Sequence, residues 1–329
     1  MKKLIIGLVL SLMLLTMFSA CSTTNELVFA DAGWDSIKFH NAVAGFIATN
    51  AFGYDNWREV SGTTPITHQG TLTGEINVHM EEWTDNISTY QQDLEDGKLK
   101  EVGINFDDNY QGFYVPRYVI EGDAERGIEP MAPDLKTVQD LKKYKDVFPD
   151  DEQPDKGRIY GAIPGWEIDN IMHNKYLYNG LDENFNYFRP GSDPALSAAL
   201  SGAYEKGEPV VGYYWEPTWL LGKYDFVLLE DHPYDPTKPE EYAEGKTECP
   251  PVRVTIAVSN EFFEKDPEYC VFLSKYRSSS QLTSEALAHI QETGDNHMDT
   301  AKWYLKKYDE FLDDWLDPDK AQLIRDALK

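Results

Sequence analysis

Short apolar runs alternate with longer amphipathic segments along most of this chain. The short runs are rich in β-branched and aromatic residues, as buried strands are; we place strands at residues 26–30, 75–80, 118–120, 158–163, 209–214 and 253–259. The longer segments repeat apolar residues at helical spacing; we place helices at residues 35–53, 85–96, 167–178, 194–206 and 301–315. Strands that alternate with helices predict an α/β fold with mainly parallel sheets.

The N-terminus follows a different pattern, which is typical of a secretory signal peptide. Two lysines precede an apolar run at residues 4–18, and a Ser-Ala pair follows it. The run is shorter than the ~20 residues that span a membrane, so we predict that residues 1–20 are cleaved. The segment Phe-Ser-Ala-Cys ending at Cys21 resembles a bacterial lipobox. This implies that Cys21 is lipidated, and that residues 21–26 tether an extracytoplasmic protein to the outer face of the cell membrane.

The composition indicates a folded and strongly acidic protein. The formal net charge is -27, and it becomes -29 without the two lysines of the signal peptide. Such a surface repels nucleic acid and anionic lipid headgroups, so we exclude nucleic-acid partners and expect membrane contact only through the lipid anchor. Aromatic residues make up 13% of the chain, which is too many for a disordered acidic segment.

The predicted loop, the cysteines and the histidines indicate little about the function of the protein. Residues 231–251 are rich in Pro, Asp and Glu and predict a long surface loop. Cys249 and Cys270 could form a disulfide outside the cytoplasm or remain separate thiols, and both alternatives stay open. The seven histidines show no metal-ligand spacing and there is no Cys-x-x-Cys, so we predict neither a metal site nor a cofactor.

Four of the eight tryptophans share one kind of position. Each lies just past the carboxyl end of a predicted strand, close to the start of a helix. These residues are Trp34, Trp83, Trp166 and Trp215. Ligands of open α/β sheets bind in the crevice outside those strand ends, so we predict that the four rings converge on a cleft. We expect the others to serve packing: Trp57, Trp219, Trp303 and Trp315.

Several indole rings around one space suit a particular ligand chemistry. A trimethylammonium group carries a charge but has no N–H to donate, so aromatic faces are its natural partners, each worth roughly 0.5–2 kcal/mol. An ordinary ammonium group is more strongly hydrated and needs oxygen acceptors. A sugar also stacks on tryptophan, but it needs a dense ring of polar side chains. The pattern therefore favours a quaternary ammonium ligand, with a sugar as its rival.

Five short motifs in order along the chain carry a family resemblance. They are residues 33–36 (Gly-Trp-Asp-Ser), 81–83 (Glu-Glu-Trp), 111–113 (Gln-Gly-Phe), 163–167 (Ile-Pro-Gly-Trp-Glu) and 214–217 (Tyr-Trp-Glu-Pro). Together they resemble the glycine betaine, proline betaine and choline substrate-binding proteins of ABC importers over residues 27–329. The resemblance implies a two-lobed periplasmic-binding-protein fold with the ligand cleft between the lobes. Lobe I would comprise residues 27–112 and 226–329, and lobe II residues 113–225.

The same resemblance implies which residues meet the ligand. Trp83, Trp166 and Trp215 match the aromatic box of betaine binders, and Trp34 and Phe113 match box positions of choline binders. Backbone N–H groups at the helix start 167–168 would receive a betaine carboxylate, a role that suits a helix N-terminus. With the aspartate of the first motif, the expected binding set is Trp34, Asp35, Trp83, Phe113, Trp166, Glu167, Ile168 and Trp215.

Departures from the family leave the choice of ligand open. Ile87 stands where a basic or polar side chain often helps to hold the carboxylate, and the disulfide that brackets the lobe II tryptophan in some betaine binders is absent. Glu167 stands where choline binders carry an acid. If the Glu167 carboxylate points into the cleft, it would favour choline. If it points outward, the backbone N–H groups at residues 167–168 are free to receive a betaine carboxylate. We predict glycine betaine, with choline or proline betaine next.

The resemblance also implies partners and argues against catalysis. A binding protein of this kind delivers its ligand to a membrane permease driven by an ATPase, although a signalling receptor of the same fold is an open alternative. The rival of another class is a secreted carbohydrate-active enzyme with a Trp-lined cleft, in which paired carboxylates would come from Glu82, Glu167 and Glu216. The chain has no Gly-x-Ser-x-Gly and no metal motif, so we predict no catalytic residue.

Overall fold

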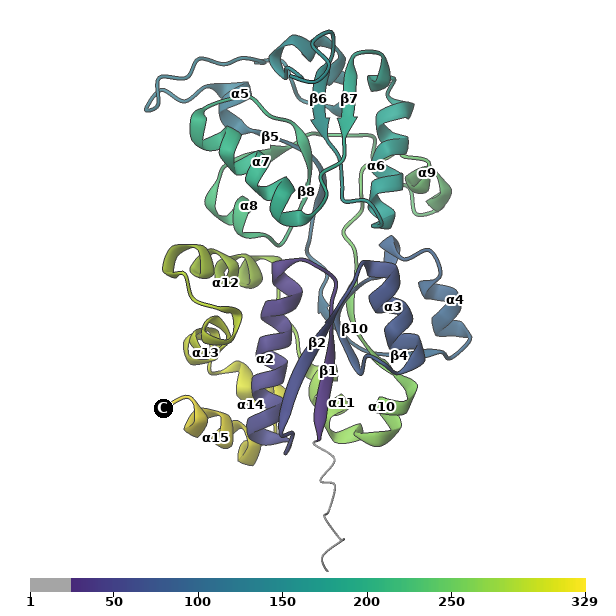
Figure 1. The fold of residues 1–329 in the computed structure, drawn as a ribbon, viewed down its shortest axis with the longest axis vertical. Helices are drawn as coiled ribbons and strands as arrows, with labels where there is room; N and C mark the ends of the chain where they lie inside the picture. Colours follow the sequence, from purple (N-terminus) through teal and green to yellow (C-terminus); the bar gives the residue numbers. More distant parts are fainter. Residues whose placement is uncertain (1–24) are drawn as a thin grey trace, which may run out of the picture.

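The computed structural model describes residues 25–329 (Figure 1). The predictions of a signal peptide at residues 1–20 and of lipidation at Cys21 lie outside these residues. Within residues 25–329, no helix is long and apolar enough to cross a membrane. The chain forms two lobes, each built around its own mixed sheet with helices packed on it, so the predicted two-lobed α/β fold is confirmed.

The lower lobe in Figure 1, lobe I, contains a sheet with the strand order β2-β1-β3-β10-β4. Its strands are β1 (Glu26–Asp31), β2 (Asn56–Ser61), β3 (Val78–Trp83), β4 (Leu99–Phe106) and β10 (Val254–Ser259). β1 runs parallel to β2 and β3, whereas β10 is antiparallel to β3 and β4. Every residue of β3 and β10 is buried, as expected for central strands covered on both faces.

The upper lobe, lobe II, contains a sheet with the order β7-β6-β8-β5-β9. Its strands are β5 (Gln111–Pro116), β6 (Gly157–Tyr160), β7 (Phe185–Phe188), β8 (Gly212–Trp215) and β9 (Phe226–Leu228). β6 is parallel to β7 and β8, and β5 is antiparallel to β8 and β9. The expectation of mainly parallel sheets is therefore wrong for half of the pairings. The reason is that β5 and β10 enter their sheets from the other lobe instead of through a helical crossover on the same sheet.

The helices cover the faces of the two sheets (Figure 1). Lobe I has α2 (Asp35–Ala51), α3 (Thr64–Thr73), α4 (Tyr90–Glu95), α10 (Asn260–Lys265), α11 (Pro267–Lys275), α12 (Ser280–Thr293), α13 (His297–Lys307), α14 (Phe311–Trp315) and α15 (Pro318–Ala327). Lobe II has α5 (Arg117–Glu121), α6 (Glu167–Tyr178), α7 (Asp193–Lys206), α8 (Trp219–Lys223) and α9 (Pro239–Ala243). Short 3-10 turns are η1 (Thr84–Asn86), η2 (Val138–Lys143), η3 (Lys145–Val147) and η4 (Leu181–Glu183).

Three predicted elements differ from the structure. The helix predicted at residues 85–96 is interrupted: η1 ends at Asn86 and α4 begins at Tyr90. Residues 118–120, predicted as a strand, lie in α5, because β5 ends at Pro116, whose fixed φ suits the entry to a helix. The helix predicted at residues 301–315 is divided into α13 and α14. At the break, the hydroxyl of Tyr308 donates a hydrogen bond to Glu285 of α12 (2.6 Å).

The chain passes between the lobes twice, after β4 and before β10. Asn109 in the first passage and Val252 in the second exchange two hydrogen bonds. Asn109 Nδ2 donates to the Val252 carbonyl (2.6 Å), and the Val252 N–H donates to Asn109 Oδ1 (3.0 Å). The sheet of lobe II begins at Gln111 and its last strand ends at Leu228, so this sheet extends beyond residues 113–225 on both sides. The lobe boundaries given by the sequence stay a prediction.

The segment of residues 231–251, predicted as a surface loop, packs partly on lobe II. Lys175 on α6 is 2% exposed; it forms an ion pair with Asp231 and donates to the carbonyl of Thr247. Cys249 lies in the same segment and Cys270 lies on α11, and both are buried free thiols. Of the two alternatives for these cysteines, the structure has the separate thiols.

Candidate ligand-binding site

Two adjoining hollows lie between the lobes and share Thr64, Asn86, Trp166 and Glu167. The wider one has about 1800 Å³ of empty space that includes open solvent. The other, the tryptophan-lined pocket, lies at the carboxyl ends of β1, β3 and β8 and contains about 350 Å³ of empty space, part of it open to solvent. The lining residues come from both lobes: Trp34, Thr64, Trp83 and Asn86 from lobe I, and Trp166, Glu167, Ile168, Tyr213 and Trp215 from lobe II. All four tryptophans that follow strand ends in the sequence line this one space.

The local backbone holds each of the four tryptophans at the pocket. Trp34 and Trp166 are the N-caps of α2 and α6. The glycine before each has a φ of 99° and 94°, respectively, which is the left-handed region that glycine adopts most easily. Trp83 and Trp215 are the last residues of β3 and β8. The sharp turn into each helix and the end of each strand therefore direct an indole ring to the cleft.

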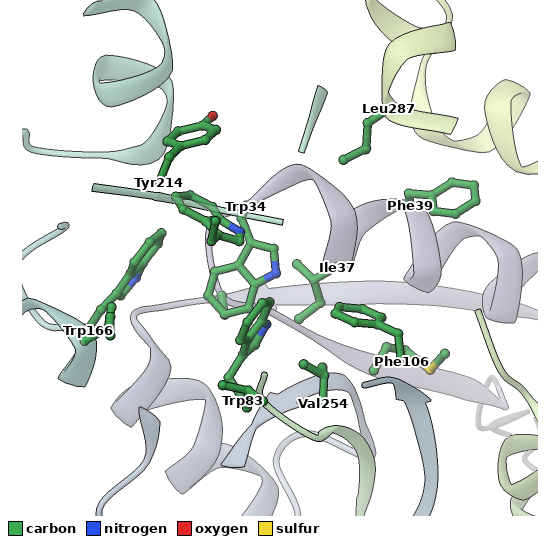
Figure 2. Packing of buried hydrophobic residues seen from close by; sticks show 14 of the residues in the cluster. Trp34, Ile37, Phe39, Trp83, Phe106, Trp166, Tyr214, Val254 and Leu287 are labelled. Atoms are coloured by element: carbon green, nitrogen blue, oxygen red, sulfur yellow. The ribbon is translucent and has the colours of Figure 1, made fainter. Parts of the chain in front are cut away.

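The rings meet nearly at right angles. Trp34 and Trp166, from opposite lobes, have centroids 5.5 Å apart and planes at 88°. Trp166 and Trp215 have centroids 5.2 Å apart and planes at 84°. Figure 2 shows Trp34, Trp83 and Trp166 turned toward one another. Perpendicular ring faces can form adjoining walls of a box, and two faces at this spacing can both lie within about 6 Å of one cation.

The start of α6 supplies polar groups at the edge of the pocket. The N–H groups of Glu167 and Ile168 donate to no acceptor among residues 25–329. The Glu167 carboxylate is half-buried and accepts a hydrogen bond from Asn170 Nδ2 (3.2 Å), one turn further along the helix. Because of this contact, the carboxylate lies along the surface of α6, toward Asn170. The free N–H groups at the positive end of the helix dipole can receive an anionic group of a ligand.

A buried carboxylate lies behind the lobe I rings. Glu81 precedes Trp83 by two residues on β3, so the two side chains share a face of the strand. Glu81 Oε2 accepts hydrogen bonds from Trp34 Nε1 (2.6 Å), Trp83 Nε1 (3.3 Å) and Ser36 Oγ (3.1 Å). One oxygen atom therefore holds both lobe I indoles. The expected binding set omits Glu81, because a strand that is buried on both faces shows no alternation that would single it out.

The charge of Glu81 is not balanced by a cation. Burial raises its pKa to about 7, although the hydrogen bonds from Trp34, Ser36 and Trp83 oppose the rise. His40 Nε2 of α2 lies 3.6 Å from Glu81 Oε1. Burial lowers the pKa of His40 to about 3, so this histidine is neutral near pH 7.

Two residues of the expected set lie outside the tryptophan-lined pocket. Phe113 on β5 is 1% exposed and lines a separate pocket beside β9. Asp35 lines a smaller pocket of about 210 Å³, which shares Trp34 and Trp215 with the tryptophan-lined pocket. Tyr213, absent from the expected set, does line the tryptophan-lined pocket. It precedes Trp215 by two residues, and the two rings are stacked at 5.8 Å and 20°, so the two-residue period of a strand could have identified it.

Three of the remaining tryptophans pack against lobe I side chains. Trp57 meets Phe29 edge to face at 5.7 Å, and Trp315 lies 4.6 Å from Tyr276. Trp303 stacks on His289 at 4.1 Å. These contacts confirm the packing role predicted for the three, whereas Trp219 lines the smaller pocket beside Asp35.

The acids of the rival enzyme hypothesis do not gather at this pocket. Glu82 lies on the other face of β3 and pairs with His68 Nδ1 (3.1 Å). Neither Glu82 nor Glu216 is among the lining residues, and Glu167 is the only acid that is. A glycosidase needs two carboxyl groups that flank one bond, so the arrangement of these acids does not favour hydrolysis.

Comparisons with known proteins agree with this geometry. Residues 25–307 match the family described as the substrate binding domain of ABC-type glycine betaine transport systems. A glycine betaine/L-proline-binding protein of an ABC transporter from Borrelia burgdorferi is 19% identical, with a TM-score of 0.70 over 91% of this chain and 99% of that chain. An ABC-transporter choline-binding protein in complex with choline is 20% identical, with a TM-score of 0.70 over 93% and 99%. A closed lactococcal protein complexed with glycine betaine is 18% identical, with a TM-score of 0.65 over 89% and 100%. No curated protein sequence matches the chain significantly.

Identities near 20% show a shared fold alone, whereas the family match extends over most of the chain. Members of this family bind small solutes outside the cytoplasm for ABC importers, and they are transport proteins instead of enzymes. The chain therefore belongs to the family of substrate-binding domains of ABC-type glycine betaine transport systems.

Proposed function

We propose that this protein captures a quaternary ammonium compound in an aromatic cage and delivers it to the permease of an ABC importer. The ligand is glycine betaine first, with choline or proline betaine next. The cage consists of Trp34, Trp83, Trp166 and Trp215. The observation that carries the proposal is that these four rings, from two lobes, line one pocket. Ring faces satisfy the charge of a group that has no N–H to donate, whereas a sugar needs more polar side chains than this lining offers.

Closure of the lobes follows from the way the cage is divided. Each lobe contributes two of the four rings, so neither lobe completes the cage alone. A ligand that contacts both lobes binds the closed arrangement more tightly than the open one and shifts the population toward it. The closed form is then the one that docks on the permease, whose ATPase drives import.

The start of α6 supports a ligand with a carboxylate. The N–H groups of Glu167 and Ile168 have no acceptor among the described residues and lie at the pocket edge. A betaine carboxylate would accept from both groups, while its trimethylammonium group enters the cage. Choline has only a hydroxyl to offer there. The contact between Glu167 and Asn170 supports the outward orientation of Glu167, which keeps these donors available.

Isothermal titration calorimetry with glycine betaine, choline, proline betaine, carnitine and sugars tests the proposal. Replacement of any cage tryptophan by alanine should weaken binding by roughly 1–3 kcal/mol, because each loses buried area and a cation–π partner. Trp57→Ala and Trp315→Ala are matched controls, and they should lower stability with little change in affinity. Binding of a sugar in the calorimeter would refute the cage. Intrinsic fluorescence gives a second readout: the cage would also be refuted if the ligand quenched Trp83→Ala and Trp215→Ala as strongly as the wild type.

A second experiment separates choline from betaine. We expect wild-type protein to bind glycine betaine more tightly than choline, and Glu167→Gln to keep that order. If the wild type prefers choline and the glutamine variant loses this preference, the Glu167 carboxylate points into the cleft and the ligand is choline.

We also propose that lipidated Cys21 anchors the mature protein to the outer face of the cell membrane. The signal-like residues 1–20 and the lipobox-like segment before Cys21 support this. Mass spectrometry of the mature N-terminus should find an acyl-glyceryl cysteine. Cleavage at another position, or a Cys21→Ala variant that stays membrane-bound, would contradict the anchor.

A further inference from the structure

Glu81 has an unusual place for a carboxylate. Its side chain is fully buried in lobe I, and a single oxygen accepts from the two lobe I indoles and from Ser36. Indole N–H groups have only one donor each. Glu81 therefore uses the entire hydrogen-bonding capacity of Trp34 and Trp83, and it fixes the direction in which each ring faces.

The groups around Glu81 leave its negative charge without a cationic partner. From α2, His40 faces Glu81 Oε1, but its Nδ1 is engaged with the Tyr276 hydroxyl (2.7 Å) and its Nε2 with Thr283 Oγ1 (3.3 Å). From β3 itself, His79 Nδ1 lies 3.3 Å from the Glu81 N–H. No lysine or arginine among residues 25–329 lies within ion-pair distance of Glu81. A buried, unpaired carboxylate is costly unless a cation comes close to it.

We propose that Glu81 is the positioning and charge-selecting residue of the cage: it orients Trp34 and Trp83 through their indole N–H groups and places a negative charge at the N–H edges of both rings. This inference rests on the proposed function, because the cation that completes the charge balance is the quaternary ammonium group of the ligand. The acceptor of an indole N–H lies near the plane of the ring, so the ligand nitrogen would lie against the ring faces while Glu81 Oε2 lies at their edges.

Two consequences follow for binding. A permanent cation should bind better than a neutral molecule of the same shape, because only the cation meets the field of Glu81. Affinity should also rise with pH through the Glu81 pKa, because the bound cation favours the ionised carboxylate and binding releases a proton. His40 stays neutral over that range, since burial lowers its pKa to about 3. His79 is fully buried, and burial lowers its pKa as well.

The first test uses choline and its neutral carbon isostere, 3,3-dimethyl-1-butanol, as probes. Calorimetry on wild-type protein should show choline affinity rising about tenfold as pH passes through the Glu81 pKa, with no change for the isostere. In Glu81→Gln, which keeps the shape and one acceptor, the pH dependence should vanish and the preference for choline should fall about tenfold. Glu82→Gln is the matched control, since it removes the adjacent buried carboxylate from the opposite face, and it should keep both properties. The proposal would be overturned if Glu81→Gln kept the pH dependence of choline affinity. It would also be overturned if Glu81→Gln and Glu82→Gln lost the preference for choline to the same extent.

The second test needs no variant that changes Glu81, and its NMR measurement is made without a ligand. The indole N–H signals of Trp34 and Trp83 in the NMR spectrum, assigned with Trp→Phe variants, should shift together with pH as Glu81 ionises. The Trp57 signal should not. If both signals stay fixed across the pKa, Glu81 does not act on the rings. If they shift but no quaternary ammonium compound binds, the proposed function fails while the role of Glu81 in orienting the rings stands.

Discussion

Glu81 and Glu82 are consecutive residues of β3 and are both fully buried, yet they meet opposite surroundings. Glu81 faces neutral donors and has a raised pKa. Glu82 faces His68, which also contacts Asp93 Oδ2 (3.2 Å). Burial opposes the charge of Glu82, but the neighbouring His79 and His68 outweigh it and lower the pKa of Glu82. Likewise, burial works against protonation of His68, but Glu82 and Asp93 outweigh it and raise the His68 pKa.

Burial alone therefore does not decide the cost of a charge. On the Glu82 face the charges compensate each other within the protein, so this face serves stability. On the Glu81 face the compensating charge is missing, so this face is stabilised by a ligand that carries one.

The largest effect is expected for His68→Leu. This change leaves Glu82 buried without its partner, which should lower the free energy of unfolding at neutral pH by about 3–5 kcal/mol. His40→Leu is the matched change on the other face. It should cost less, because His40 is neutral and its loss mainly leaves the Tyr276 hydroxyl without its 2.7 Å partner. Urea unfolding of both variants measures the difference, and equal costs would remove the contrast.

The next effect is on the pH dependence of stability. The folded-state pKa of Glu81 is raised, so its contribution is fully favourable below the unfolded pKa and is lost as pH rises through about 7. Over that range, wild-type stability should fall by about 3 kcal/mol relative to Glu81→Gln. Thermal or urea unfolding at several pH values measures this. Wild-type stability that instead decreases, relative to Glu81→Gln, as pH falls through this range would show that the sign is wrong.

A smaller effect is expected for Ser36→Ala. This change removes one of the donors to Glu81 Oε2, at 3.1 Å. The free energy of unfolding should fall by about 1 kcal/mol, and the pKa of Glu81 should rise further, because the charged form loses a hydrogen bond. The midpoint of the indole N–H shift with pH should move upward. An unmoved midpoint would mean that the serine does not act on the carboxylate.

The smallest effect is expected for Lys98→Ala. Lys98 Nζ pairs with Asp93 Oδ1 (2.8 Å), but its side chain is 48% exposed. Exposed pairs contribute little because solvent screens them, so stability should change little and ligand affinity should not change. A loss as large as that of His68→Leu would show that the charge network on the Glu82 face depends on its exposed end.

Much of the fold could be predicted from the sequence, because its signals are local. The apolar run of β10, the Asp-Ser start of α2 and the glycine that ends α7 each mark one element. Five strands were not predicted: β2, β4, β5, β7 and β9. Residues of β2 are exposed or half-exposed, β5 begins just after the chain crosses between the lobes, and β9 has only three residues. Their pairing depends on partners distant in sequence, which no local pattern reports.

The site residues also fall into those that the sequence could predict and those that it could not. Trp34, Trp83, Trp166 and Trp215 could be found because their position after strand ends is itself a sequence feature. Glu81 could not, because its role depends on two indole N–H groups, one of them 47 positions away. Local sequence does not show which of two adjacent buried glutamates faces a cationic partner.

The central position of β10 bears on the order in which the chain acquires its structure. β10 pairs with β3 and β4, although all of lobe II lies between them in the sequence. Lobe II is contiguous from β5 to β9 and can form its own sheet early, whereas lobe I waits for a distant strand, and such long-range pairing is slow. Pulse-labelled hydrogen exchange should accordingly find β8 protected before β3.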